Sequence, residues 1–478
     1  MTEFLNKLYI DGEWRDGATG ETFDVLNPAD ESVITSVASG KIEDATACVD
    51  AAEVAFASWA AKSPRERSEI LRRAFYIYMQ KIDDIARLIT LENGKAGADA
   101  LGEAKYAGEF FRWYAEEAVR PEGHLGIAPA SGARILVHQK PAGIAVLVTP
   151  WNYPAAMGTR KIAPALAAGC SVVIKPASET PLTMLALVPI LEEAGVPSGV
   201  VNVLPSRSSG AVVGAMLADP RVRVVSFTGS TEVGRKLLHA AADNVVKPAM
   251  ELGGNAPFIV CKDADIDAAA EGLMVAKMRN LGEACTAANR IYIHEDVEHP
   301  FVKAFTAKMA ALRVGDPLDP ATDVGPLVNA ETRDKVDYFV RDAIEKGAKV
   351  KLGGQRPNGP GFFYPPTVMT SVPDNAKCLS DEIFGPVAAI QTFTDEDEIL
   401  VRANNTEYGL VAYVYTRDMA RGLSISERLE FGMIGLNRGL VSDPAAPFGG
   451  VKQSGLGREG GKEGLLEFQE TQYISTAW

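Results

Sequence analysis

The sequence predicts an α/β protein with two successive domains, each built on a largely parallel sheet. From Gly143 onward, short β-branched runs alternate with helical segments, and the runs are apolar on both faces, as in strands that helices cover on each side. A second series of this kind begins near residue 256. The length of 478 residues also exceeds what one simple core needs, which favours two or three domains.

The first 118 residues are expected to form a mainly helical layer. A hairpin-like stretch at 8–17 comes first, helical spacing covers 44–62, and residues 63–66 (SPRE) have the pattern of a capping box with proline at the first helical position. One long helix is expected to follow through 70–95, and a further helix over 98–118.

The two α/β series account for most of the remaining chain. Expected strands of the first series are 143–150, 171–176, 200–205 and 222–229, with helical segments at 159–169 and 181–195. Those of the second series are 256–261 and 290–294, followed by helical segments at 300–312 and from 336. Two strand-like stretches stand apart, at 123–143 and in the tail at 468–478.

Composition and charge exclude several classes of protein. The formal net charge of −14 argues against a general binder of nucleic acid or acidic membranes, which needs a basic face. Five cysteines without zinc spacing, an N-terminus without a signal-peptide pattern and the lack of a long apolar run favour a cytoplasmic protein with no metal site and no membrane span.

Two glycine-containing stretches are candidates for binding a phosphate. Residues 455–460 (GLGREG) match GxGxxG, but they follow a loop instead of a strand, so we interpret them as a turn. In SFTGSTEVGRK, a strand leads to Gly229 and Ser230 and a helix follows, which suits a phosphate at a helix N-terminus. A plain helix cap by Ser230 or Thr231 fits this second stretch equally well.

Three further residues are candidates for chemistry. Lys175 leaves the end of a strand, where α/β sheets bind ligands, although a surface lysine is the simpler interpretation. Glu251 lies between apolar residues and a Gly-Gly pair, where burial raises the pKa of a carboxyl and makes it a usable base; a carboxylate bonded to backbone amides is the alternative. Cys285 lies among small and polar residues, in NLGEACTAANR, which fits a reactive cysteine better than a packed one.

Seven motifs together resemble the aldehyde dehydrogenase superfamily in the family's order, over essentially the whole chain. They are TPWNYP (149–154), KPASETP (175–181), FTGSTEVG (227–234), ELGGNAPFIV (251–260), GEACTAANR (282–290), DEIFGPV (381–387) and PFGGVKQSGLGRE (447–459). Within the superfamily, the sequence is most similar to succinate-semialdehyde dehydrogenases.

The resemblance implies a covalent mechanism. Cys285 matches the nucleophile that adds to the aldehyde to give a thiohemiacetal and then a thioester. Asn152 and the backbone N–H of Cys285 match the oxyanion hole, and Glu251 matches the base that activates water for hydrolysis of the thioester.

The resemblance also implies a cofactor site for NADP or NAD, without GxGxxG. Its residues are Trp151, Lys175, Ser178, Gly229, Ser230, Leu252, Glu382 and Phe384. Ser178 occupies a position where many NAD-preferring relatives have a glutamate, which repels a 2′-phosphate, so we expect NADP to be accepted and preferred. A dual-cofactor enzyme with little preference is the alternative. Arg207 is a second candidate cation for the phosphate.

The expected substrate is a short carboxylated aldehyde. Arg160 and Arg279 flank the nucleophile in sequence, and arginine presents a planar fork that suits a carboxylate. Succinate-semialdehyde dehydrogenases have arginines at both matching positions and a serine that matches Ser442. A surface or interdomain ion pair is the alternative for either arginine.

One position departs from that subfamily, because Ala287 replaces the second cysteine found in many of its members. We therefore expect no disulfide switch here, and glutarate semialdehyde or a sulfonated aldehyde stays open as the substrate. A coenzyme A-acylating enzyme and a non-catalytic protein of the same fold are less favoured, because Glu251 and the other site residues are retained.

By resemblance, the architecture consists of three parts. They are a Rossmann-like cofactor domain (1–118 and 142–253), a catalytic domain (254–453) and a β oligomerisation arm (119–141 and 454–478). Arm strands that add to a neighbour's sheet hide edges that otherwise invite aggregation, so a homodimer or homotetramer is expected.

Overall fold

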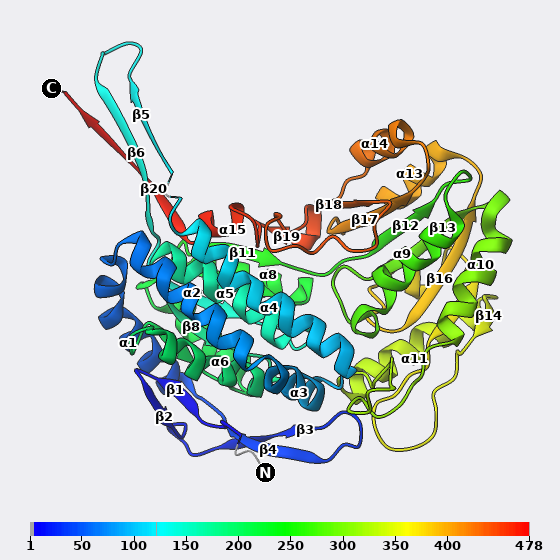
Figure 1. Ribbon diagram of the computed structural model, residues 1–478, viewed down its shortest axis with the longest axis horizontal. Helices are drawn as coiled ribbons and strands as arrows, with labels where there is room; N and C mark the ends of the chain where they lie inside the picture. Colours follow the sequence, from blue (N-terminus) through cyan, green and yellow to red (C-terminus); the bar gives the residue numbers. More distant parts are fainter. Residues whose placement is uncertain (1–3, 121, 478) are drawn as a thin grey trace.

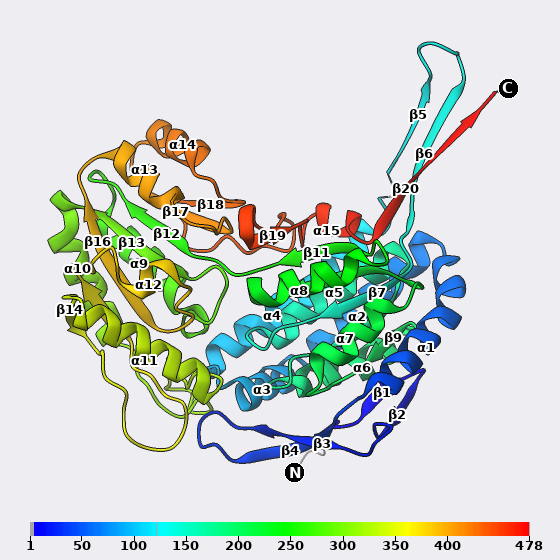
Figure 2. The ribbon, with the colours of Figure 1, turned by 180° about the vertical axis from the view of Figure 1, so that it is seen from behind.

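The structure is a computed structural model that describes residues 4–120 and 122–477. Figure 1 shows two α/β lobes side by side, with a thin β arm that projects from the first lobe, and Figure 2 shows them from behind. The predicted α/β class is confirmed. Residues 1–3, 121 and 478, which fall within the predicted domain ranges, lie outside the described part.

Two hairpins and four helices begin the first lobe. They are β1 (Leu8–Ile10), β2 (Glu13–Arg15), β3 (Thr22–Leu26), β4 (Val33–Ala38), α1 (Ile42–Ala60), α2 (Pro64–Gln80), α3 (Ile82–Asn93) and α4 (Gly97–Glu117). The predicted capping box is confirmed, because Ser63 and Glu66 each accept the other's backbone N–H.

The single long helix predicted after the capping box is wrong, because the chain leaves the helical conformation at Lys81, with φ −107° and ψ 12°. The amide of Lys81 donates to the carbonyl of Tyr78, three residues back, which tightens the last turn of α2. Helix α3 starts at the next residue and buries Ile85 and Ile89 in the core of the first lobe.

The eight-stranded sheet of the first lobe has the order β19-β11-β10-β7-β8-β9-β1-β2, and its central strands from β11 to β9 are parallel. The strands not yet given are β7 (Ile144–Val148), β8 (Ser171–Lys175), β9 (Val201–Val203), β10 (Val222–Thr228), β11 (Lys247–Glu251) and β19 (Gly455–Leu456). The helices between them are α5 (Pro154–Ala168), α6 (Pro181–Ala194), α7 (Ser209–Ala218) and α8 (Thr231–Ala242). The strands predicted for the first series are therefore confirmed.

The second lobe has a seven-stranded sheet of order β14-β15-β16-β13-β12-β17-β18, parallel except for β14. Its strands are β12 (Ala256–Val260), β13 (Ala288–His294), β14 (Lys349–Leu352), β15 (Thr367–Thr370), β16 (Val387–Phe393), β17 (Val411–Tyr415) and β18 (Met433–Leu436). Its helices are α9 (Ile266–Met278), η1 (Arg279–Gly282), α10 (Glu295–Ala310), α11 (Ala330–Glu345), α12 (Lys377–Ser380), α13 (Glu396–Asn404) and α14 (Met419–Arg428).

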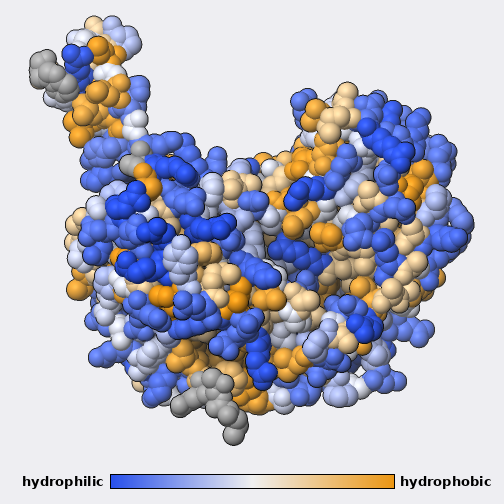
Figure 3. Space-filling model, viewed as in Figure 1, coloured by the Kyte–Doolittle hydropathy of each residue, from blue (hydrophilic) through white to orange (hydrophobic). Residues whose placement is uncertain are grey.

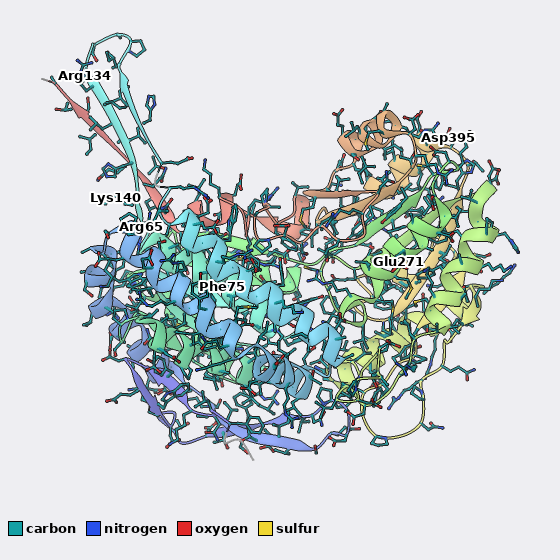
Figure 4. All side chains as sticks on the ribbon, viewed as in Figure 1. Arg65, Phe75, Arg134, Lys140, Glu271 and Asp395 are labelled. Atoms are coloured by element: carbon teal, nitrogen blue, oxygen red, sulfur yellow. The ribbon has the colours of Figure 1, made fainter. Side chains whose placement is uncertain are left out.

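The arm consists of β5 (Gly123–Ile127), β6 (Arg134–Pro141) and the C-terminal β20 (Gln469–Thr476), which pair antiparallel in the order β20-β6-β5. The labelled side chains of Arg134 and Lys140 lie along β6 in Figure 4. Apolar side chains remain uncovered on the arm, among them Leu125 (69% exposed), Ile127 (59%) and Tyr473 (57%), and Figure 3 shows apolar surface there. This sheet therefore has two open edges and exposed apolar residues.

The segment from 454 to the start of β20 belongs partly to the first lobe. It forms η2 (Lys452–Ser454), β19 and α15 (Glu463–Leu466), and β19 pairs with β11 so that Gly455 faces Glu251. Gly455 has φ 133°, and a Cβ there would lie 2.0 Å from the carbonyl oxygen of Met250. The glycine of the rejected GxGxxG pattern is thus required by close packing of two strands.

In the part of the chain that the structure describes, no helix is long and apolar enough to cross a membrane. Within the same residues, no group of three or more His, Cys, Asp and Glu side chains is arranged to hold a metal ion. All five cysteines are free, and Cys285 is the one that is not fully buried.

Candidate active site

Most of the predicted site residues meet in one pocket of about 360 Å³ between the two sheets. Predicted residues that line it are Trp151, Asn152, Gly229, Ser230, Glu251, Leu252, Cys285, Glu382 and Phe384. They come from the ends of β7, β10 and β11 and from the loops before β13 and β16. Segments more than 200 residues apart in the sequence therefore build a single cavity.

An unusual backbone places the nucleophile. Three successive residues have positive φ, Asn280 (50°), Leu281 (53°) and Gly282 (78°), and they turn the chain sharply after α9. A Cβ at Gly282 would lie 2.3 Å from the carbonyl oxygen of Gly385, so only glycine fits. The side-chain amide of Asn280 stabilises the turn by donating to the carbonyl oxygens of Asn152 (2.9 Å) and Glu283 (3.0 Å).

The Cys285 thiol is partly exposed to the pocket but is surrounded by protein. Burial raises its pKa well above the ordinary value, and the nearby carboxylate of Glu251 raises it further. The positive charge of Arg160 opposes this rise. The polar sequence around Cys285 suggested a stabilised thiolate, whereas the structure indicates a thiol that keeps its proton until a base removes it.

Glu251 has the properties of such a base. Its side chain is buried at the end of β11, and among the described residues the thiol of Cys285 is the one hydrogen-bonding neighbour of its carboxyl. Burial, and then the negative charge of Glu459, raise the pKa of Glu251 to about 8. The carboxyl is therefore poised to exchange a proton near neutral pH, and the alternative of a carboxylate satisfied by backbone amides is wrong.

Asn152 is held on both sides. Its Nδ2 donates one hydrogen bond to the carbonyl oxygen of Glu283 (3.0 Å), which leaves the second amide hydrogen for the pocket. The backbone carbonyl oxygen of Asn152 accepts from the ammonium group of Lys95 (3.0 Å), and Lys95 forms a buried ion pair with Glu103. Glu103 in turn accepts the backbone N–H of Ala155 (2.9 Å) at the first turn of α5.

The cofactor side of the pocket has an acceptor and an aromatic wall. Oε1 of Glu382 accepts from the backbone N–H of Gly254 (3.2 Å), and its carboxyl faces the pocket. The ring of Phe384, at a residue with φ 56°, meets the indole of Trp151 edge-on at 5.4 Å. Opposite them, Ser230 caps helix α8 where β10 ends, so a helix N-terminus faces the cavity. These groups suit a dinucleotide, with an acceptor for ribose hydroxyls and helix amides for phosphates.

Lys175 and Ser178 lie beside this pocket. Lys175 is buried, and burial lowers its pKa to about 8, with the charge of Glu179 opposing the shift and that of Arg207 adding to it. The hydroxyl of Ser178 donates to the carbonyl oxygen of Ser206 (3.0 Å), and Glu179 is the neighbour that lines the pocket. Arg207 stacks on Phe23 with its guanidinium 5.4 Å from the ring centre.

Arg160 and Arg279, two of the three predicted substrate residues, both contact Tyr106, and the third, Ser442, lies beside Arg279. Nη1 of Arg279 lies 3.4 Å from the hydroxyl of Ser442, and its guanidinium stacks on Tyr153 (5.1 Å) and Tyr106 (5.5 Å). Arg160 donates to the hydroxyl of Tyr106 (3.1 Å).

Arg160 is also part of a buried ion-pair group. Its Nη1 lies 3.2 Å from a carboxylate oxygen of Glu459, which also pairs with Lys161, and its guanidinium stacks on Phe448 at 4.2 Å. Arg160 therefore forms a buried ion pair, where the alternative from the sequence was a surface or interdomain one, and its Nε remains without a partner among the described residues. Arg279 forms no salt bridge in the described part of the chain and is the less committed cation.

Sequence reasoning missed two groups of residues. Asn329, Glu331, Thr332 and Lys335 line the pocket from the first turns of α11, a helix that was predicted but whose start was not considered as part of a site. The sequence did not predict Glu459 as a site residue, because it lies within the GxGxxG pattern that we interpret as a turn. A charged residue between two glycines of that pattern could have indicated it.

Comparison with known proteins gives a consistent result. The family model described as "Aldehyde dehydrogenase family" matches residues 14–474. A succinate-semialdehyde dehydrogenase of Paenarthrobacter nicotinovorans is 52% identical, over 93% of this chain and 99% of that protein. A glutarate-semialdehyde dehydrogenase of Pseudomonas aeruginosa is 45% identical, over 98% and 97%, and a 3-sulfolactaldehyde dehydrogenase of Pseudomonas putida is 44% identical, over 98% and 96%.

A solved structure agrees with these relatives. The crystal structure of an Escherichia coli NADP-dependent enzyme superposes with a TM-score of 0.98 at 45% identity, covering 99% of this chain and 98% of that one. Both the sequence and the backbone therefore match over nearly the full length, and the predicted resemblance is confirmed.

Proposed function

Because the chain belongs to the aldehyde dehydrogenase family, we propose that it oxidises a short carboxylated aldehyde, most simply succinate semialdehyde, to the acid with NADP or NAD. The observation that supports this substrate is the half-buried guanidinium of Arg279, which lies beside Ser442 and has no salt bridge among the described residues. A guanidinium without a carboxylate partner in the protein can bind the carboxylate of a ligand.

The charges around this position favour an anionic substrate. Arg160 and Lys161 are buried and Arg279 is half-buried, and Glu459 is the carboxylate that pairs with the first two. Glu251, with a pKa of about 8, is largely neutral at pH 7. The pocket therefore has an excess of positive charge, which a carboxylate or sulfonate tail neutralises.

The chemistry follows from three side chains. The sulfur of Cys285 adds to the aldehyde carbon, and Asn152 Nδ2–H and the Cys285 N–H donate to the oxygen that becomes negative. The bound dinucleotide supplies the two-electron acceptor, and oxidation of the adduct leaves a thioester on Cys285. Glu251 then takes a proton from water, whose oxygen attacks the thioester carbon and releases the acid and the thiol.

This assignment of Glu251 also favours water over coenzyme A as the acyl acceptor. Apart from the Cys285 thiol, its carboxyl has no hydrogen-bond partner among the described residues and can accept one from a water molecule. A non-catalytic role is disfavoured, because the nucleophile, the base and the amide donor line the same cavity. Thiol alkylation that substrate blocks tests that alternative.

The proposed cofactor preference depends on the charged residues around Ser178. Serine in place of a carboxylate favours NADP, and Lys175 and Arg207 add positive charge nearby. The carboxyl of Glu179 in the same wall acts in the opposite direction. We propose that both dinucleotides are used and that NADP is preferred.

The arm supports a homodimer or homotetramer. Its open strand edges and exposed apolar side chains suit addition to a sheet of a second copy, where pairing satisfies the free backbone groups. The domain limits and the cytoplasmic location predicted from the sequence stay predictions.

The proposal is tested with a panel of neutral and anionic aldehydes, assayed with each dinucleotide. We expect kcat/KM for succinate semialdehyde to exceed that for butanal at least 100-fold, about the contribution of a paired carboxylate. Glutarate semialdehyde and a sulfonated aldehyde test the tail length and head group. Equal rates for butanal and the semialdehyde acid refute the substrate assignment, and failure to reduce either dinucleotide refutes the function.

A further inference from the structure

The segment 378–385 carries Glu382 and Phe384, yet it has little regular structure to hold it in place. Helix α12 ends at Ser380, Asp381 is extended with φ −106°, and Phe384 has a positive φ of 56°. Its backbone groups therefore need partners outside the segment. Two buried asparagines provide them.

Asn289 bonds this segment in both directions. Its Nδ2 lies within hydrogen-bonding distance of the carbonyl oxygens of Cys378 (3.0 Å) and Asp381 (3.1 Å). Its Oδ1 accepts the backbone N–H of Ile383 (3.0 Å), the residue next to Glu382. A side-chain amide supplies two donor hydrogens and an acceptor oxygen, as this arrangement requires, and the side chain is 3% exposed.

Asn255 completes the arrangement. Its Nδ2 donates to the carbonyl oxygens of Leu379 (2.9 Å) and Ser380 (3.2 Å), and its Oδ1 accepts from Asn289 Nδ2 (2.8 Å). The backbone oxygen of Asn255 is held by Nε and Nη2 of Arg290, at 3.1 and 2.9 Å. The two asparagines thus form one buried group, which we call the asparagine pair.

Each member of the asparagine pair follows one catalytic residue at the same short distance in sequence. Asn255 comes four residues after Glu251, and Asn289 comes four residues after Cys285. The strands that follow, β12 and β13, are neighbours in the second sheet. The pair therefore connects the chain segments of the base, the nucleophile and the cofactor ligand through side-chain hydrogen bonds.

We propose that Asn255 and Asn289 are positioning residues that fix Glu382 relative to Cys285 and Glu251, so that dinucleotide binding depends on their amide donors. This inference rests on the proposed function, with Glu382 as the acceptor for ribose hydroxyls of the dinucleotide. Asparagine to aspartate is the informative change, because it keeps the shape and the acceptor oxygen but removes the donors to the carbonyls of 378–381.

The experiment compares Asn289→Asp and Asn255→Asp with Asn375→Asp as the matched control, because Asn375 is exposed and its side chain takes part in none of these bonds. Dissociation constants for NADP and NAD are measured by quenching of tryptophan fluorescence, since Trp151 lines the pocket. We expect about 10- to 100-fold weaker binding of both dinucleotides in each pair variant, from loss of two hydrogen bonds per side chain, and no change in the control.

A second measurement separates positioning from loss of folding. The rate of Cys285 alkylation by iodoacetamide, without dinucleotide, should stay within about threefold of the wild-type rate, because Asn280, Asn152 and Glu283 hold the nucleophile loop independently. Dinucleotide binding within twofold of the control overturns the inference, as does a parallel fall in alkylation and binding. If Asn289→Asp does not fold, Asn255→Asp decides alone. Failure of the wild-type protein to bind dinucleotide refutes the proposed function instead.

Discussion

Replacing Arg279 with methionine is the most direct test of how the pocket selects its substrate. The arginine lies at the end of α9, between the rings of Tyr106 and Tyr153, with Ser442 at 3.4 Å. Methionine keeps an unbranched apolar stem between the two rings, but it removes the charge and all five donors. The change therefore isolates the electrostatic contribution of Arg279 better than alanine, which leaves a cavity.

The expected loss follows from the bonds that a substrate carboxylate makes. A bidentate guanidinium–carboxylate contact has two charge-assisted hydrogen bonds, each worth about 1.5–3 kcal/mol. The lower end applies, because the substrate carboxylate loses its water on binding, which leaves about 3 kcal/mol for the pair. Since about 1.4 kcal/mol is a factor of ten, kcat/KM for succinate semialdehyde should fall about 100-fold.

The assay is the initial rate of dinucleotide reduction, with saturating dinucleotide, for succinate semialdehyde and for butanal, which has the same chain length and no carboxylate. Butanal should lose less than about threefold, because it never contacts the guanidinium. Ser442→Ala, which removes one neutral partner, should cost the acidic substrate about fivefold. Equal losses on both aldehydes in the Arg279→Met enzyme would refute the assignment of Arg279 to the carboxylate.

The remaining predictions concern the base and the cofactor. Burial raises the pKa of Glu251 to about 8, so the rate of thioester hydrolysis should increase as pH rises through that value. Glu251→Gln should lose this pH dependence and slow hydrolysis about 100- to 1,000-fold, while a burst of dinucleotide reduction remains in stopped-flow measurements. The raised pKa also means that the wild-type protein loses stability as pH rises from about 4.5 through 8. At pH 9, Glu251→Gln should therefore unfold at a higher denaturant concentration than the wild type, and its free energy of unfolding should be higher by no more than about 5 kcal/mol. A carboxylate at position 178 should repel a 2′-phosphate, so Ser178→Glu should shift the ratio of kcat/KM from NADP towards NAD at least tenfold; an unchanged ratio would show that this wall does not set the preference.

Local patterns predicted the parts of the fold and site that local chemistry decides. The alternation of apolar runs and helices predicted both sheets, because a strand buried on both faces needs apolar residues at every position. Ser63 and Glu66 marked the start of α2, since a capping box uses residues three apart. Gly229 and Ser230 marked the pocket for the same reason, because a strand end and a helix start are adjacent in the chain.

Interactions between distant segments had no such signal. Arg160 and Glu459 are 299 residues apart, so nothing near either one shows that their charges meet. The break at Lys81 lacks glycine and proline, and tertiary packing of α3 against the first lobe decides it. The hydroxyl of Ser178 turns to the carbonyl of Ser206, and that orientation depends on a loop 28 residues away.

The polar atoms that the fold leaves without partners connect these observations. Within the described residues, they include Oδ1 of Asn152 and Nε of Arg160 near Cys285, and the Glu251 carboxyl has only the Cys285 thiol as a neighbour. Others lie elsewhere, among them Trp59 Nε1. Each such atom costs about 1–3 kcal/mol unless something bonds to it, which a ligand can do for those that line the pocket. Water, an aldehyde oxygen and a carboxylate tail are the groups that would satisfy acceptors and donors of these kinds. By contrast, every polar atom of Asn255 and Asn289 is bonded within the protein, as expected of residues that position the site and never bind substrate. The two asparagines that hold the 378–385 segment are therefore satisfied by the protein, whereas Asn152, which lines the pocket, keeps an acceptor oxygen without a partner among the described residues.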